Sequence, residues 1–177
     1  MGVDDDLEAG TSTVPEAADE RAERRGLWIR RATLTALTVF VLLGATGQLG
    51  VRSGTASASD GALTATLTYP HVARPALAVP YHLVIHLDAP PQDQIEVRIS
   101  SRFIDSFDEN GRSPEPAESS TDGDEVIWTF DPPDGDTLTV SLDTRVEPGV
   151  QWRRTGTTSV TVGDDSVSLD HTMWVLP

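Results

Sequence analysis

Histidine is the first side chain to consider as a metal ligand or general base in this sequence, which contains four. His82 and His86 fall in a segment of alternating apolar and polar residues, so both should project from one face of a strand. Their Cα atoms would lie about 13 Å apart, too far for two imidazoles to share one zinc ion. We expect both to be polar residues on an outward face. We also expect His71, after a Tyr-Pro turn, and His171, at a core-facing position of the last strand, to be structural.

The stretch Phe103 to Asp124 is the longest without a strand pattern, and loops of that length are usually functional or disordered. Four of its residues imitate positions one, three, five and six of an EF-hand calcium loop: Ser106, Asp108, Asn110 and Gly111. The match fails because position one is serine, and because position twelve is Ala117 where a bidentate glutamate is needed. The role of this stretch stays open.

Three further acidic clusters, at residues 122–125, 134–136 and 164–165, stand beside turn-forming glycines and prolines. They would bind calcium weakly if they gathered at one end of the domain. Acidic turns that end strands are the simpler expectation, so we assign no metal ligand and expect no cofactor.

Several kinds of enzyme are excluded by composition. The sequence has no cysteine and no lysine, which removes thiol nucleophiles, thiolate zinc sites, disulfides, P-loops and Schiff bases. Gly-x-Ser-x-Gly and His-Glu-x-x-His motifs are also missing. Paired carboxylates for glycoside hydrolysis stay open, since the twenty acids of residues 52–177 make many pairs. We therefore expect no enzyme and assign no catalytic residue, with an exported hydrolase as the last alternative.

The net charge of −15 is concentrated in the C-terminal part, where twenty acids and eight arginines over residues 52–177 give −12. Such a surface repels phosphate backbones, so nucleic-acid binding is disfavoured. Cations and basic protein surfaces remain plausible partners.

The elements that would position these side chains are strands, because apolar residues recur at every second position from Ala62 onward. Seven segments show this alternation: 63–69, 81–87, 95–99, 126–130, 138–142, 150–162 and 167–175. Turn-forming residues separate them, and no helical pattern follows residue 60. We predict an all-β domain over 62–177, a seven-strand antiparallel sandwich of immunoglobulin or fibronectin type. Its largest core residues should be Trp128, Phe130 and Trp152.

The N-terminal part predicts a membrane anchor. Residues 1–25 are acidic with little apolar content, which predicts a disordered cytoplasmic tail. Residues 26–51 predict a transmembrane helix with a basic flank, whose uncharged run, 32–51, is long enough to span a bilayer. Five arginines precede this run and one follows it, so the N-terminus should be cytoplasmic. Residues 52–61 are expected to form a linker to an extracytoplasmic domain.

A cleavable signal peptide is the alternative. Ala56-Ser57-Ala58 is a small-x-small site, and Arg24-Arg25 can be read as a twin-arginine pair. The long charged region before the apolar run and the distance from Leu43 to Ala58 favour the uncleaved anchor. Cleavage after Ala58 nevertheless stays open.

Five segments of the outer domain carry a resemblance to known sequences: 73–80, 107–111, 128–136, 147–152 and 174–177. In them the chain resembles uncharacterised bacterial single-pass membrane proteins with an immunoglobulin-like extracytoplasmic domain. The resemblance covers residues 61 to 177 and implies a plasma-membrane location with the C-terminal domain outside. It carries no activity and transfers no functional residue.

Two classes of binding function fit these features. The first is a protein-interaction or accessory module acting close to the membrane, with an integral membrane protein as one candidate partner. The second is a cell-envelope module for carbohydrate or calcium, which would require Tyr69, Tyr81 and Trp174 to be exposed together, or clustered carboxylates. The identity of the partner and the oligomeric state are not encoded in any motif.

Overall fold

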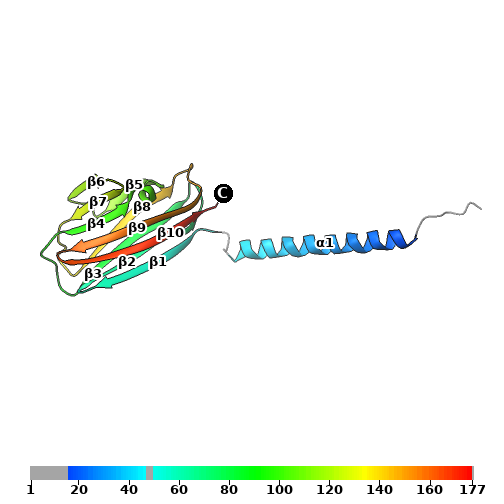
Figure 1. Ribbon diagram of the computed structural model, residues 1–177, viewed down its shortest axis with the longest axis horizontal. Helices are drawn as coiled ribbons and strands as arrows, with labels where there is room; N and C mark the ends of the chain where they lie inside the picture. Colours follow the sequence, from blue (N-terminus) through cyan, green and yellow to red (C-terminus); the bar gives the residue numbers. More distant parts are fainter. Residues whose placement is uncertain (1–15, 47–49, 177) are drawn as a thin grey trace, which may run out of the picture. The chain divides into compact units, whose positions relative to one another are not determined.

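The computed structural model describes residues 16–46 and 50–176, in two compact units that divide at Leu49 and Gly50. The first unit contains helix α1 (Glu16–Ala45), drawn in blue and cyan in Figure 1. Within it, Arg24–Ala45 forms 22 residues with a mean hydropathy of 1.4, long and apolar enough to cross a membrane. A signal sequence near an N-terminus has the same length and composition, so the helix alone does not distinguish the two.

The helix differs from its predicted bounds of 26–51. It begins ten residues earlier because the Glu, Ala and Arg residues that precede the apolar run are strong helix formers. It ends at Ala45, shortly before two glycines of low helix propensity, Gly47 and Gly50. Residues 16–25, predicted to be disordered, are therefore helical, and residues 1–15 of the predicted tail lie outside the described residues.

The second unit is the β domain, formed by ten strands and one short helix (Figure 1). Its elements are β1 (Arg52–Asp60), β2 (Leu63–Ala73), β3 (Ala78–Leu87), β4 (Ile95–Ser100), α2 (Ser101–Ile104), β5 (Phe107–Ser113), β6 (Glu118–Asp122), β7 (Glu125–Phe130), β8 (Thr137–Val146), β9 (Trp152–Val162) and β10 (Asp165–Val175). The predicted all-β domain is confirmed, but the predicted number of seven strands is wrong. The seven predicted strands are present, as β2 to β4 and β7 to β10, and β1, β5 and β6 are additional.

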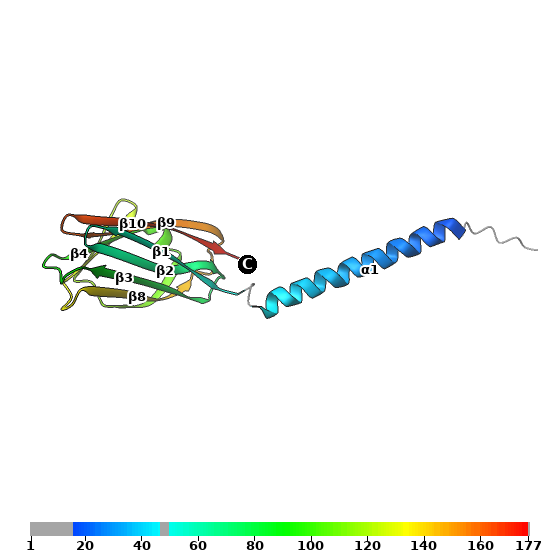
Figure 2. The same cartoon turned by 90° about the horizontal axis from the view of Figure 1, so that it is seen from below.

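The strands form one hydrogen-bonded path, β5-β8-β3-β2-β10-β9-β4-β7-β6, with β1 added on β2. The path folds into two facing layers, so that β9 and β10 lie on one side and β3 and β8 on the other in Figure 2. All pairings are antiparallel except that of β2 with β10, where Trp174 and Val175 lie opposite Val72 and Ala73 in parallel register. This short parallel pairing, which the alternation pattern did not predict, joins the two layers.

The core lies between the layers and is apolar except for a few buried polar groups. Among these, Tyr81 of β3 and Thr158 of β9 share a hydrogen bond of 2.9 Å between their hydroxyls, which connects one layer to the other. Complete burial raises the pKa of Tyr81 well above its usual value, and the Thr158 bond only partly offsets this. Trp128 and Phe130 are buried as predicted.

The prediction that Trp152 packs in the core is wrong, because 72% of its surface is exposed. Its φ of 68° lies in the left-handed region, which redirects the chain at the start of β9. Val150 is buried and Trp152 points outward, although strand alternation would place both on the same face.

The prediction of a linker at residues 52–61 is also wrong, since residues 52–60 form strand β1. The strand pairs with β2 from Arg52↔Val72 to Asp60↔Leu63, and Ser57 and Thr66 share a hydroxyl hydrogen bond of 2.9 Å. Its side chains are small, so its stability comes from the backbone ladder, and no apolar alternation identifies it. At Gly54 a Cβ would come within 2.9 Å of the Tyr69 ring, so glycine allows the two strands to approach.

The stretch 103–124 contains regular structure rather than one long loop: the end of α2, then β5 and β6. All five residues of β6 are exposed, and β5 is exposed or half-buried after Phe107. Edge strands commonly carry polar and charged residues, which removes the alternation that predicts a strand.

Candidate functional site

Strands β5 and β6 are the two ends of the hydrogen-bonded path, so each has an edge without a strand partner in the described part of the chain. Between them is a pocket of about 230 Å³. Its lining includes Phe107 and Arg112 of β5, Ser119 of β6 and Trp128 of β7. We call this pocket, together with the two free strand edges, the open side.

A stacked pair of side chains crosses the open side. The guanidinium carbon of Arg112 lies 3.8 Å from the centroid of the Trp128 ring, which is cation–π geometry. Arg112 also donates two hydrogen bonds to Glu109, from Nε to Oε1 at 3.0 Å and from an Nη to Oε2 at 2.8 Å. The bidentate hydrogen bond to Glu109 fixes the position of the guanidinium over the indole.

The indole nitrogen of Trp128 is the unusual atom of this site. Trp128 is 1% exposed, and its Nε1–H has no hydrogen-bond partner among the described residues. Buried indole N–H groups are normally paired, because an unpaired buried donor costs about 1 to 3 kcal/mol. Trp128 is also one of the residues that line the pocket.

The open side is also strongly acidic. Residues 105–125, which include β5 and β6, contain eight acidic residues and a single arginine, Arg112. Three of the eight acids are paired with arginines: Glu109 with Arg112, Asp108 with Arg145 of β8, and Glu125 with Arg98 of β4. A basic ligand would therefore meet a complementary field at this side of the domain.

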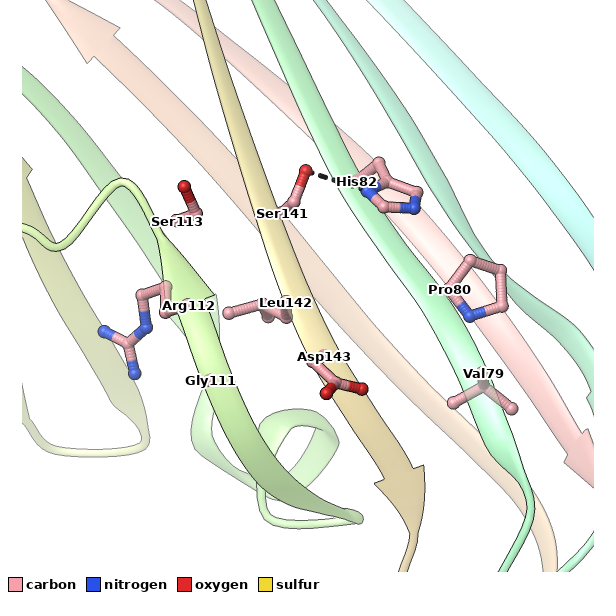
Figure 3. A pocket seen from close by; sticks show the side chains of 9 residues that line it. All are labelled: Val79, Pro80, His82, Gly111, Arg112, Ser113, Ser141, Leu142 and Asp143. Carbon is pink, nitrogen blue, oxygen red and sulfur yellow. Dashed lines mark hydrogen bonds between the residues drawn. The ribbon is translucent and has the colours of Figure 1, made fainter.

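A second, shallower groove of about 450 Å³ lies on the outer face of β3, β5 and β8 (Figure 3). His82 and Ser141 lie side by side there, with His82 Nδ1 2.9 Å from Ser141 Oγ. His86 makes the same kind of contact with Thr137, at 3.0 Å. Both histidines are exposed on the outward face, as predicted. In Figure 3 the Arg112 side chain points away from His82 and Ser141, and Arg112 lines both this groove and the pocket of the open side.

The acidic clusters do not gather at one end. Residues 122–125 form the turn between β6 and β7, whereas 134–136 and 164–165 stand at the opposite end of the strands, beside Leu87 and Ile95. The segment that partly matches an EF-hand motif does not form a calcium-binding loop. Ser106 is buried and its Oγ donates to the Arg102 carbonyl, and residues 108–111 belong to β5. In the part of the chain that the structure describes, no three His, Asp or Glu side chains are placed to hold a metal ion.

His171 is buried in an aromatic environment, as its core-facing position predicts. Its ring meets Phe103 edge-on at 4.2 Å and lies 5.5 Å from Tyr69, and its Nδ1 is 3.1 Å from the Leu169 carbonyl. Burial lowers the pKa of His171, so the ring is neutral in the folded domain. His71 instead is exposed within β2, which runs through the predicted Tyr-Pro turn without a break.

Comparisons with known proteins give no family for this chain. No family model matches the sequence, and no curated protein matches it. A crystal structure described as a CaDoc0917–CaCohA2 complex contains a chain with 14% sequence identity, aligned over 59% of this chain and 94% of that chain. The TM-score of 0.37 is too low for the likeness to support an argument about fold or function.

The sequence pattern indicates the stretch 103–124 as a candidate region but does not indicate the contact between Arg112 and Trp128. Trp128 was identified as a core residue and not as part of a site. The signal that points to the pair is Arg112 itself, the only cation in a run of eight acids, together with Glu109 three residues before it.

Proposed function

We propose that this chain is a non-enzymatic, membrane-anchored β-sandwich that binds a protein partner outside the plasma membrane, close to the bilayer. In this proposal α1 spans the membrane, the N-terminus is cytoplasmic, and the β domain is extracytoplasmic. The arrangement of β2 to β4 and β7 to β10 in two facing layers supports an immunoglobulin-like type of sandwich.

The surface of α1 supports the anchor. Large apolar side chains cover it, and Leu34 and Phe40 are 53% and 62% exposed. Its threonines bond back onto the helix, where Thr33 Oγ1 donates to the Ile29 carbonyl and Thr38 Oγ1 to that of Leu34. Such bonds satisfy hydroxyls that would otherwise be unpaired in hydrocarbon. The arginines before the apolar run favour a cytoplasmic N-terminus.

The position of Ala58 argues against cleavage there. Ala56 and Ala58 lie inside β1 and pack against the core, with Ala58 opposite Ala65 of β2. Cleavage after Ala58 would remove most of β1 and expose the edge of β2.

Alkaline-carbonate extraction of membranes that contain the full chain, with an epitope at its C-terminus, tests the anchor. We expect the epitope to stay in the membrane pellet at the mass of the uncleaved chain. Release into the supernatant at a mass reduced by the first 58 residues would reject it.

The unpaired Trp128 N–H beside the Arg112–Glu109 pair is the observation that carries the interaction proposal. We infer that the open side takes a basic, extended segment of a partner protein. A peptide carbonyl can accept from Trp128 Nε1, and the β6 edge can pair with an added strand. The register irregularity between Glu109 and Gly111 makes the β5 edge less suitable for this.

The alternative function, binding of carbohydrate or calcium, would require Tyr69, Tyr81 and Trp174 to be exposed together, or clustered carboxylates. Tyr81 is completely buried and Tyr69 half-buried, whereas Trp174 is 43% exposed, so the three rings are not exposed together. These three rings therefore do not form a sugar-binding platform.

Site-specific photo-crosslinking in intact membranes tests the interaction. We would place a photoreactive residue at Ser119, on the open side, and a matched one at Ser168, an exposed serine of β10. We expect one adduct of defined mass from position 119 and none from position 168. The substitution Trp128→Phe, which removes the N–H and keeps an aromatic ring, should lower its yield.

Equal adducts from both positions would indicate random collision and reject the open side as the binding surface. An adduct whose yield is unchanged by Trp128→Phe would keep the surface but reject the role of the indole N–H.

A further inference from the structure

The exposed large apolar side chains of the β domain gather at one end. They are Leu77, Trp152, Trp174 and Leu176, and they are 46%, 72%, 43% and 41% exposed. Strand register places them together, because Trp174 pairs with Val72, Trp152 pairs with Val175, and the Leu176 N–H donates to the Ala73 carbonyl.

The same end is where the chain enters the domain. Arg52, the first residue of β1, pairs with Val72. The C-terminal end of β10 lies beside the start of β1 in Figure 1. We call this the entry end: residues 50–53, 72–78, 147–154 and 172–176.

Two backbone conformations at the entry end are unfavourable. Ala76 and Trp152, with φ of 62° and 68°, are the non-glycine residues with positive φ in the described part of the chain. Side chains with a Cβ rarely adopt this conformation, and strained backbone concentrates at functional sites. Of these two residues, Ala76 directly precedes the exposed Leu77, and Trp152 is itself exposed.

Charge at the entry end is opposite in sign to that of the whole domain. The four segments contain Arg52, Arg74, Arg153 and Arg154 against one acid, Glu147, so four positive charges and one negative leave +3. The domain as a whole carries −12. Tryptophan and leucine beside arginine is the composition of surfaces that rest at a membrane–water interface.

We propose that the entry end contacts the lipid headgroups of the membrane in which α1 is anchored, with Trp152 and Trp174 inserted at the interface. This inference rests on the proposed anchor. Only residues 46–51 join α1 to β1, and six extended residues reach roughly 20 Å. The connection therefore keeps the entry end within reach of the headgroup layer.

Tryptophan quenching in nanodiscs that hold one copy of the full chain tests the contact. The background variant is Trp28→Phe, which removes the indole of α1 and leaves those of residues 128, 152 and 174. In discs with lipids brominated near the headgroups, we expect quenched emission and weak quenching by aqueous acrylamide. Adding Trp152→Phe and Trp174→Phe should abolish the bromolipid quenching and leave the buried Trp128 signal.

Two outcomes would overturn the contact. Quenching by acrylamide but not by bromolipid would place both indoles in water, and quenching by neither would place them against protein. Protease protection of α1 in the same discs separates this failure from failure of the anchor. Protected α1 with no bromolipid quenching rejects the lipid contact alone, whereas unprotected α1 rejects the anchor, and with it this inference.

Discussion

The guanidinium carbon of Arg112 lies over the Trp128 ring, 3.8 Å from its centroid, and this contact joins strand β5 to strand β7 across the open side. Neither strand pairs with the other, so this contact links the two layers where no backbone ladder does. The contact combines the arginine charge, a buried aromatic ring and the Glu109 carboxylate that bonds the guanidinium.

Replacing the arginine, Arg112→Gln, should lower the free energy of unfolding by about 1 kcal/mol, because a partly desolvated cation–π contact is lost. Chemical denaturation of the full chain in detergent micelles, followed by circular dichroism, measures this. The control is Arg145→Gln. Arg145 is exposed, and its ion pair with Asp108, at 3.7 Å, lies at the surface. Equal effects of both substitutions would contradict a special role for the stack.

The hydroxyl pair of Tyr81 and Thr158 should behave as a unit. Either Tyr81→Phe or Thr158→Val leaves one buried hydroxyl without its partner, so each should cost about 1 to 3 kcal/mol. The double variant should cost less than the sum, because it leaves neither hydroxyl unpaired. A double-mutant cycle of unfolding free energies measures the coupling, and additive effects would show that the bond contributes nothing.

His171 should make the β domain less stable in mild acid. Its folded pKa is lowered below the unfolded value of 6.5 by burial, although the nearby Asp170 acts in the opposite direction. The unfolded state therefore gains a proton as pH falls through 6.5 while the folded state does not, so stability present above this pH is lost below it.

The substitution His171→Gln should flatten the dependence of unfolding free energy on pH between 7 and about 5, where carboxylates contribute little. The control for removing a histidine outside the core is His82→Gln, since His82 is exposed. The prediction fails when the His171→Gln slope equals that of the parent chain.

Close packing around Gly156 should make this position intolerant of any side chain. A Cβ there would lie 2.5 Å from the Phe103 Cβ and 3.0 Å from His171 Nε2. We expect Gly156→Ala to cost about 1 to 3 kcal/mol, as overpacking of a core does. Gly135→Ala, with no atom within 4 Å of its Cβ, should be close to neutral in the same unfolding assay.

Sequence alone predicted the strands whose inner faces are apolar. Leu83 and Ile85, for example, predict β3, because burial of one face of a strand requires apolar residues at every second position. The same reasoning missed β1, whose half-buried residues are Gly54, Ala56 and Ala58, and β6, which has no buried face at all. Trp152 was placed wrongly because a positive φ breaks the alternation without leaving a mark in the sequence.

The site was less predictable than the fold. Arg112 and Trp128 are far apart in the sequence and belong to strands that do not pair, so no local pattern brings them together. Only the acidic character of the surrounding residues, from Asp105 to Glu125, is visible without the structure.

The parallel pairing of β2 with β10 imposes an order on biosynthesis. Strand β2 can pair with β10 only after β10 has been synthesised, so Val72 and Ala73 pair with Trp174 and Val175 late in synthesis. A growing chain halted before β10 would leave one whole edge of β9 unpaired, whereas β2, which pairs with β1, would lack a partner only at Val72 and Ala73. Until β10 is complete, these unpaired backbone groups are open to pairing with another chain, so the unfinished domain is prone to aggregation.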